Sequence, residues 1–218
     1  MAYSAGFSPH PKISYVGAAP TGVASEAEYL EIGLARQVDP EQLRRALDEA
    51  LPEGLDVLEA VVAGPGSLAE RIQASHWRVE LPGVSAGELR VAVAEFLSRE
   101  ELLVDRLTKD GKRSLDTRAA VLSASVDGPA TEPGDLSSGG TGTEPGGRAI
   151  LDMVVRQVTP SVRPDDVLAA LRLVAGLAPA APPVAVRVAQ GPLDGSSTGA
   201  GSVGDPLAAD RSPVRTPS

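Results

Sequence analysis

Three helical segments, separated by stretches of β-forming residues, constrain the fold of this chain more than any other sequence feature. Asp39 and Pro40 begin the first segment, and Ser85 with Glu88 forms a capping box at the start of the second. Pro164 begins the third, where two acidic residues favour the positive end of the helix dipole. The periodicity of apolar residues predicts helices over Pro40–Leu51, Ala86–Ser98 and Pro164–Val174.

The stretches between these helices alternate or are rich in β-forming residues, which predicts strands. Asp110-Gly111 is a strong two-residue signal for a hairpin that joins two of them. We expect strands at Lys12–Ala18, Glu28–Gln37, Leu55–Ala63, Ile72–Leu81, Glu101–Thr108, Arg113–Ser123, Ile150–Val158 and Val184–Ala189.

The order of these elements predicts an α+β fold made of tandem ferredoxin-like (βαββαβ) sandwiches. Residues 70–190 follow the order strand, helix, strand, strand, helix, strand, with one additional hairpin strand. Residues 1–66 follow the order strand, strand, helix, strand. We therefore expect a complete second unit and a first unit that lacks its initial strand and helix.

Two further segments have too few apolar side chains to offset the backbone entropy that ordering them would cost. Residues 128–148 are expected to be a disordered insert within the second unit, and residues 191–218 a disordered tail.

The chain has no cysteine, which excludes disulfides and thiolate metal sites. We expect no metal and no cofactor.

No stretch reaches roughly 18 uninterrupted apolar residues, so we expect a cytoplasmic protein without a membrane partner. The net charge of −9 argues against a broad polyanion-binding surface, although Lys109, Lys112, Arg113 and Arg118 gather near the predicted hairpin.

His10 lies between two prolines and could serve as a proton shuttle, as a donor to an anionic ligand, or only as a loop-shaping residue. Lys12 could bind a phosphate or carboxylate, or be an exposed lysine at a strand start. Ser25 lies near a group of three carboxylates, which could hold a hard cation or pair with Lys12 and Arg36. These carboxylates are Glu26, Glu28 and Glu31. We expect a common surface cleft that contains His10, Lys12, Ser25, Glu26 and Glu28.

Asp116 and Arg118 stand two residues apart on a predicted strand, so we expect both to point to one face and to serve as a structural ion pair or a binding pair. His76 precedes Trp77 on another strand and is interpreted as a surface or edge histidine.

The run Tyr3-Ser4-Ala5-Gly6-Phe7-Ser8-Pro9-His10-Pro11-Lys12-Ile13-Ser14 is followed by Gly22-Val23-Ala24-Ser25-Glu26-Ala27-Glu28-Tyr29. This pattern resembles that of the radical SAM-associated proteins, in which Gly-Phe-x-Pro-His-Pro-Lys/Arg-x-Ser precedes Gly-x-x-Ser-Glu-x-Glu-Tyr. The resemblance is specific over Tyr3 to Leu34 and collinear to about Ala189. Leu115-Asp116-Thr117-Arg118 also matches, with Ala119 where that family often has proline. The family has no established activity.

Three functions are compatible with these observations. The resemblance implies an accessory or substrate-presenting partner of a radical SAM enzyme, without redox chemistry of its own, because a radical SAM enzyme holds its cluster with cysteines. Tandem ferredoxin-like units also resemble RNA-binding and RNA-processing folds. The third alternative is a small-molecule enzyme that uses His10 as its acid or base.

The resemblance also implies that Met1 is not the natural start. In the related proteins a basic strand and an amphipathic helix precede the Tyr-Ser-x-Gly-Phe loop. Their loss would leave a sheet edge unpaired and part of an apolar face uncovered.

Overall fold

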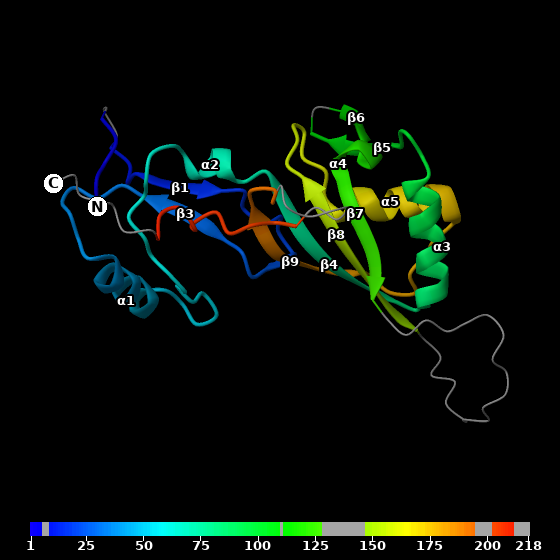
Figure 1. Cartoon of the computed structure of the whole chain (residues 1–218), viewed down its shortest axis with the longest axis horizontal. Helices are drawn as coiled ribbons and strands as arrows, with labels where there is room; N and C mark the ends of the chain where they lie inside the picture. Colours follow the sequence, from blue (N-terminus) through cyan, green and yellow to red (C-terminus); the bar gives the residue numbers. More distant parts are fainter. Residues whose placement is uncertain (6–8, 110, 128–146, 195–201, 212–218) are drawn as a thin grey trace, which may run out of the picture. The chain divides into compact units, whose positions relative to one another are not determined.

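The computed structural model describes residues 1–5, 9–109, 111–127, 147–194 and 202–211 (Figure 1). The chain forms two compact units, and neither is continuous in sequence. The first comprises Met1–Ala18, Glu28–Ile72 and Asp205–Ser218, and the second comprises Ala19–Ala27 and Gln73–Gly204. The predicted domains, residues 1–66 and residues 70–190, stay a prediction.

The second unit is built on a mixed sheet of five strands. In spatial order these are β2 (Ala24–Ser25), β9 (Val184–Gly191), β4 (Ala74–Pro82), β8 (Arg148–Arg156) and β7 (Val121–Asp127). β2 pairs with β9 in parallel, and every other neighbouring pair is antiparallel. Together with α3 (Ala86–Leu97) and α5 (Pro164–Ala175), the chain order β4, α3, β7, β8, α5, β9 has the predicted alternation of strands and helices.

Local capping fixes the helices where the sequence predicts them. The Asp39 carboxylate accepts a hydrogen bond from the Gln42 backbone N–H at 3.0 Å and begins α1 (Pro40–Ala50). Ser85 and Glu88 form the predicted capping box of α3. All three helix predictions are confirmed, each to within one residue at its C-terminal end.

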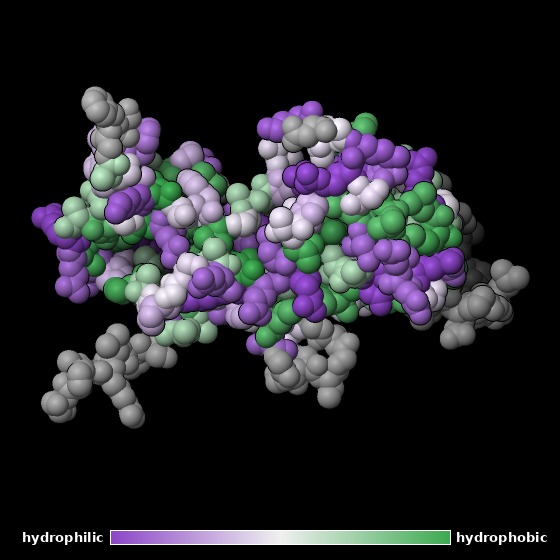
Figure 2. All heavy atoms as spheres, turned by 90° about the horizontal axis from the view of Figure 1, so that it is seen from above, coloured by the Kyte–Doolittle hydropathy of each residue, from purple (hydrophilic) through white to green (hydrophobic). Residues whose placement is uncertain are grey.

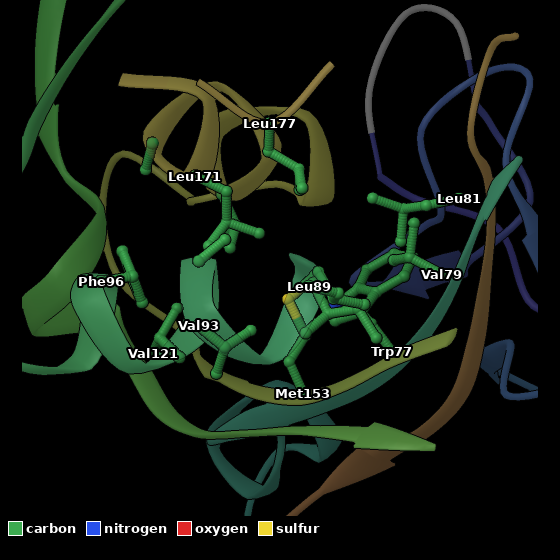
Figure 3. Close-up of a cluster of buried hydrophobic side chains, with 14 of the residues drawn as sticks. Trp77, Val79, Leu81, Leu89, Val93, Phe96, Val121, Met153, Leu171 and Leu177 are labelled. Carbon is green, nitrogen blue, oxygen red and sulfur yellow. The ribbon is translucent and has the colours of Figure 1, made fainter. Parts of the chain in front are cut away.

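The core of the second unit lies between the sheet and one helical layer (Figure 3). Alternate residues of β4 and β8 point toward the helices, because side chains alternate between the two faces of a strand. α3 and α5 contribute their apolar stripes to the same cluster, so both helices cover one face of the sheet. The cluster includes Trp77, Val79, Leu81, Leu89, Val93, Phe96, Leu151, Met153 and Leu171. Apolar side chains also reach the surface over this helical layer, where Val91 and Leu173 are exposed (Figure 2).

The predicted hairpin is confirmed. β5 (Leu103–Thr108) and β6 (Gly111–Asp116) form an antiparallel ladder in which Thr108 faces Gly111, while Asp110 lies outside the described residues. The single strand predicted over Arg113–Ser123 is wrong, because the short helix α4 (Thr117–Ala120) separates β6 from β7.

The first unit contains the ladder of β1 (Ile13–Val16) and β3 (Tyr29–Ile32), the helix α1 and the short helix α2 (Leu68–Arg71). Its buried cluster is small: Val16, Leu68 and Ile72, with Tyr29 and Leu207 packed against them. The apolar stripe of α1 is not buried. The strand predicted over Leu55–Ala63 is wrong, because β-forming residues make a strand only where a neighbouring strand can pair with them.

Part of the predicted tail makes specific contacts in the first unit. Asp210 accepts hydrogen bonds from the Arg71 guanidinium at 2.6 Å and from the Gly64 backbone N–H at 3.1 Å. Arg211 pairs with Glu59. Residues 128–146 of the predicted insert, and residues 195–201 and 212–218 of the predicted tail, lie outside the described residues.

Acidification is expected to weaken the first unit through Asp210. The hydrogen bond from Arg71 is the main cause that holds the pKa of Asp210 below its ordinary value. A carboxyl group with a lowered folded-state pKa contributes stability above its unfolded-state pKa, and this stability is lost as the pH falls through the folded-state value. Urea unfolding between pH 7 and pH 2 should therefore show a smaller loss of stability below about pH 4 for Asp210→Asn than for the wild type.

The control is Glu53→Gln, an exposed substitution in the same unit. Identical acid dependence of the wild type and Asp210→Asn would contradict the assignment.

Candidate interaction surface

The ladder of β1 and β3 presents an exposed apolar face. Ile13 stands opposite Ile32 and Tyr15 opposite Leu30, so the four side chains share one side of the ladder. Ile13 is 40%, Tyr15 70% and Leu30 44% exposed, and Ile32 is half-buried. We call these four residues the β1–β3 apolar face. Val16 and Tyr29 point to the other side, into the small buried cluster, so the ladder has one covered face and one open face.

His10 and Lys12 lie in the loop that leads into β1. The His10 backbone N–H donates to Ser4 Oγ at 3.0 Å, and its carbonyl accepts from the Ser4 N–H at 2.8 Å. Lys12 donates its N–H to the Ala2 carbonyl at 2.9 Å. These bonds join the backbone of His10 to Ser4 and that of Lys12 to Ala2, and the His10 and Lys12 side chains are exposed. A chemical role for either side chain stays a prediction.

Ser25 and Glu26 attach the second half of the motif to β9. Ser25 Oγ accepts from Arg187 Nε at 3.1 Å, and the Glu26 N–H donates to the Arg187 carbonyl at 2.9 Å. Arg187 is buried, with its guanidinium carbon 5.6 Å from the centre of the Trp77 ring. Ser25 therefore supports a buried cation of the sheet, a packing role that its sequence context does not reveal.

The five residues of the predicted cleft divide between the two units. His10, Lys12 and Glu28 belong to the first unit, whereas Ser25 and Glu26 belong to the second. A common cleft stays a prediction.

Asp116 and Arg118 stabilise the turn between β6 and β7. The placement of both on one strand is wrong, because Asp116 ends β6 and caps α4, which contains Arg118. Arg118 donates to backbone carbonyls, those of Leu97 (3.3 Å) and Val121 (3.1 Å). The Asp116 carboxylate accepts from three backbone N–H groups, those of Leu102 (3.1 Å), Arg118 (3.0 Å) and Ala119 (3.2 Å). Each side chain therefore bonds to the backbone, and the expected ion pair between them is not formed.

Replacing Asp116 by Ala is expected to lower the free energy of unfolding by about 1–3 kcal/mol, because it removes the shared acceptor of these three N–H groups. Asp116→Asn keeps one side-chain oxygen and should cost less. Urea unfolding of both variants, beside the exposed control Asp127→Ala, measures the difference. Equal stability of Asp116→Ala and the wild type would show that solvent replaces these bonds.

Residues 1–164 match the model of DUF2344, described as an uncharacterized protein conserved in bacteria. The chain belongs to the DUF2344 family. No curated protein and no solved structure matches it. The matched range includes β1, β3 and the whole motif, and its description names no activity. A link to radical SAM enzymes therefore stays a prediction.

Two polar pairs in this DUF2344 protein were not predicted from the sequence. His76 Nε2 lies 2.6 Å from Asp152 Oδ1, and Arg78 reaches Asp127 at 2.8 Å. His76 lies on β4, the middle strand of the sheet, so the edge alternative of its interpretation is wrong, whereas its side chain is 30% exposed, in agreement with the surface alternative. Because Asp152 is 76 residues away, only the pairing of β4 with β8 reveals the contact.

The described residues also form one hollow outside the β1–β3 apolar face. A hollow of about 430 Å³ lies at the start of α5, lined by Ala19, Pro20, Thr21, Val23, Arg163, Pro164 and Asp165. The described residues contain no group of three or more His, Cys, Asp or Glu that could hold a metal ion. They also contain no helix with the length and apolar character that crossing a membrane requires.

Proposed function

We propose that this DUF2344 protein is an accessory partner of a radical SAM enzyme and binds that enzyme through the β1–β3 apolar face. The proposal rests on one observation: the segment with the specific resemblance is also the segment that exposes apolar side chains. The residues with the specific resemblance, Tyr3 to Leu34, include both strands of the ladder, and these strands expose Ile13, Tyr15 and Leu30.

An exposed apolar face of this kind favours protein binding over a purely structural role. Burying apolar surface contributes about 25 cal/mol per Å², and a tyrosine supplies a large area together with a polar hydroxyl that can remain in water. Tyr15, the most exposed of the four residues, is therefore the expected anchor of the interface.

The described contacts give less support to RNA binding. Arg78 on the sheet of the second unit lies between two carboxylates, 2.8 Å from Asp127 and 3.9 Å from Asp152. Lys112 of the basic hairpin lies 2.7 Å from Asp105. Phosphate binding would have to compete with these ion pairs. A small-molecule enzyme that uses His10 is the third alternative. The exposed position of His10 gives no further support to this alternative.

We also propose the finer fold. The antiparallel order β9-β4-β8-β7, with α3 and α5 on one face, supports a ferredoxin-like second unit. The ladder of β1 and β3, with α1 after it, supports a partial copy of the same pattern in the first unit.

A photo-crosslinking amino acid at Tyr15 tests the function in the native bacterium. We expect it to capture a protein that cleaves S-adenosylmethionine once its iron–sulfur cluster is reconstituted. The same crosslinker at Glu53, an exposed position of the same unit, serves as the control and should not capture that protein. Capture of RNA alone, or equal capture at both positions, would overturn the proposal.

A further inference from the structure

We propose that the hollow at the start of α5 binds a small zwitterionic ligand, a free α-amino acid with an apolar side chain. The Arg163 guanidinium binds the carboxylate of this ligand, and the Asp165 carboxylate binds its ammonium group. The hollow lies entirely in the second unit, whereas the strand and helix expected before Met1 would complete the first. Binding at this site does not depend on the radical SAM partner.

Both walls of the hollow are attached to the core of the second unit. Val23 packs against the core cluster from one wall, while Val167 and Leu171 anchor α5 in the same cluster. A tight turn precedes Val23, whose N–H donates to the Pro20 carbonyl at 3.2 Å, and Gly22 adopts a φ of 85° that suits glycine. The hollow is therefore formed without a ligand.

The size and lining of the hollow suit a small molecule. Its volume of about 430 Å³ falls in the range of about 300–1,000 Å³ that is usual for ligand pockets. Its apolar lining can contact the side chain of the ligand, and Thr21 adds a hydroxyl group. The apolar lining residues are Ala19, Pro20, Val23 and Pro164.

The two acidic residues at the start of α5 differ in their partners. Asp166 is buried, and its carboxylate accepts from Arg106 Nη1 at 2.9 Å and from the Arg163 backbone N–H at 2.8 Å. Asp165 is exposed and lines the hollow, and its carboxylate has no hydrogen bond or ion pair within the described ranges of the chain. The fold therefore uses the Asp166 carboxylate and leaves that of Asp165 available to a ligand.

The Arg163 guanidinium is available in the same way. The Arg163 carbonyl accepts from the Asp166 N–H at 3.0 Å, so the backbone is held while the side chain is exposed. The guanidinium forms no ion pair with Asp165 or with any other residue that the structure describes. Two opposite charges therefore line one hollow without neutralising each other.

This pair of charges selects a ligand that carries both signs. Asp165 would repel a simple anion and Arg163 a simple cation, because like charges at short range raise the energy of binding. An α-amino acid carries its carboxylate and its ammonium group on one carbon atom and satisfies both side chains. A peptide terminus carries only one of the two charges, which disfavours a peptide at this site.

L-Leucine serves as the probe, and NMR follows the backbone amide signals of the full chain as leucine is added. We expect saturable shifts at Thr21, Gly22, Val23 and Asp165. Leucinamide lacks the carboxylate, and N-acetyl-leucine lacks the ammonium group. Each should bind about tenfold more weakly than leucine, because each loses one charge-assisted hydrogen bond.

Two substitutions assign the charges separately. Arg163→Met should bind leucine about tenfold more weakly than the wild type and should no longer distinguish leucine from leucinamide. Asp165→Asn should no longer distinguish leucine from N-acetyl-leucine. Arg156→Met removes an exposed cation of the same unit outside the hollow, so it is the matched control and should bind leucine as the wild type does.

The fluorescence of Trp77 in urea checks that each variant is folded, and we expect no change because both substituted side chains are exposed. Absence of saturable shifts at the hollow, equal binding of the three probes, or unchanged discrimination in Arg163→Met and Asp165→Asn would overturn the site. An equal loss in Arg156→Met would assign the binding to overall charge and would also overturn it. Crosslinking at Tyr15 tests a different surface, so either proposal can fail without the other.

Discussion

Replacing Phe96 by Ala is expected to lower the free energy of unfolding of the second unit by about 3–5 kcal/mol. Phe96 is fully buried on α3, and its ring lies in the same cluster as Val93 and Val121 (Figure 3). Truncation removes the transfer free energy of the ring and leaves a cavity that the close-packed neighbours fill only in part.

The fluorescence of Trp77, the only tryptophan and a member of this cluster, reports unfolding in urea. Val91→Ala is the matched control, because Val91 lies on the same helix and is 68% exposed. A loss below 1 kcal/mol for Phe96→Ala would mean that the cluster repacks around the missing ring.

Asp166→Ala is expected to have an effect of similar size, about 3–5 kcal/mol, by a different mechanism. Asp166 is buried in the first turn of α5, where it accepts from Arg106 Nη1 at 2.9 Å and from the Arg163 backbone N–H at 2.8 Å. Arg106 comes from β5, so its pair with Asp166 joins the hairpin to the helical layer. Removing the carboxylate leaves the largely buried guanidinium of Arg106 without its counter-charge.

The neighbouring Asp165→Ala is the control, since Asp165 is exposed in the same turn. Urea unfolding of the double variant Asp166→Ala with Arg106→Met tests the mechanism. The double variant should be more stable than Asp166→Ala alone, because it no longer buries an unpaired charge. A double variant that is less stable than Asp166→Ala would assign the loss to packing.

The elements that the sequence predicts well are those fixed by neighbouring residues. The cap of Asp39 and the capping box of Ser85 and Glu88 involve residues three apart, so each helix start can be read locally. The β5–β6 hairpin is predictable for the same reason, because its turn residues adjoin both strands.

The elements that the sequence predicts poorly depend on distant partners. Residues 55–63 have β-forming side chains but no strand to pair with, and local propensity cannot supply one. Asp116 serves as a cap because its carboxylate meets the N–H of Leu102, which a strand pattern does not show.

Contacts at the candidate surface also depend on residues that are distant in the sequence. The motif residues could be recognised in the sequence, but the pairing that leaves Tyr15 exposed and binds Ser25 to Arg187 arises only in the fold. His76 and Asp152 likewise meet only when β4 and β8 pair.

The parallel pairing of β2 with β9 has a consequence for synthesis of the chain. Ser25 and Arg187 are 162 residues apart, so β2 cannot take its place at the sheet until β9 has left the ribosome. At typical translation rates this takes roughly 10–30 s. During that time the second half of the motif has no sheet to join, and a chaperone or partner that recognises it could bind the nascent chain before the native fold hides its backbone.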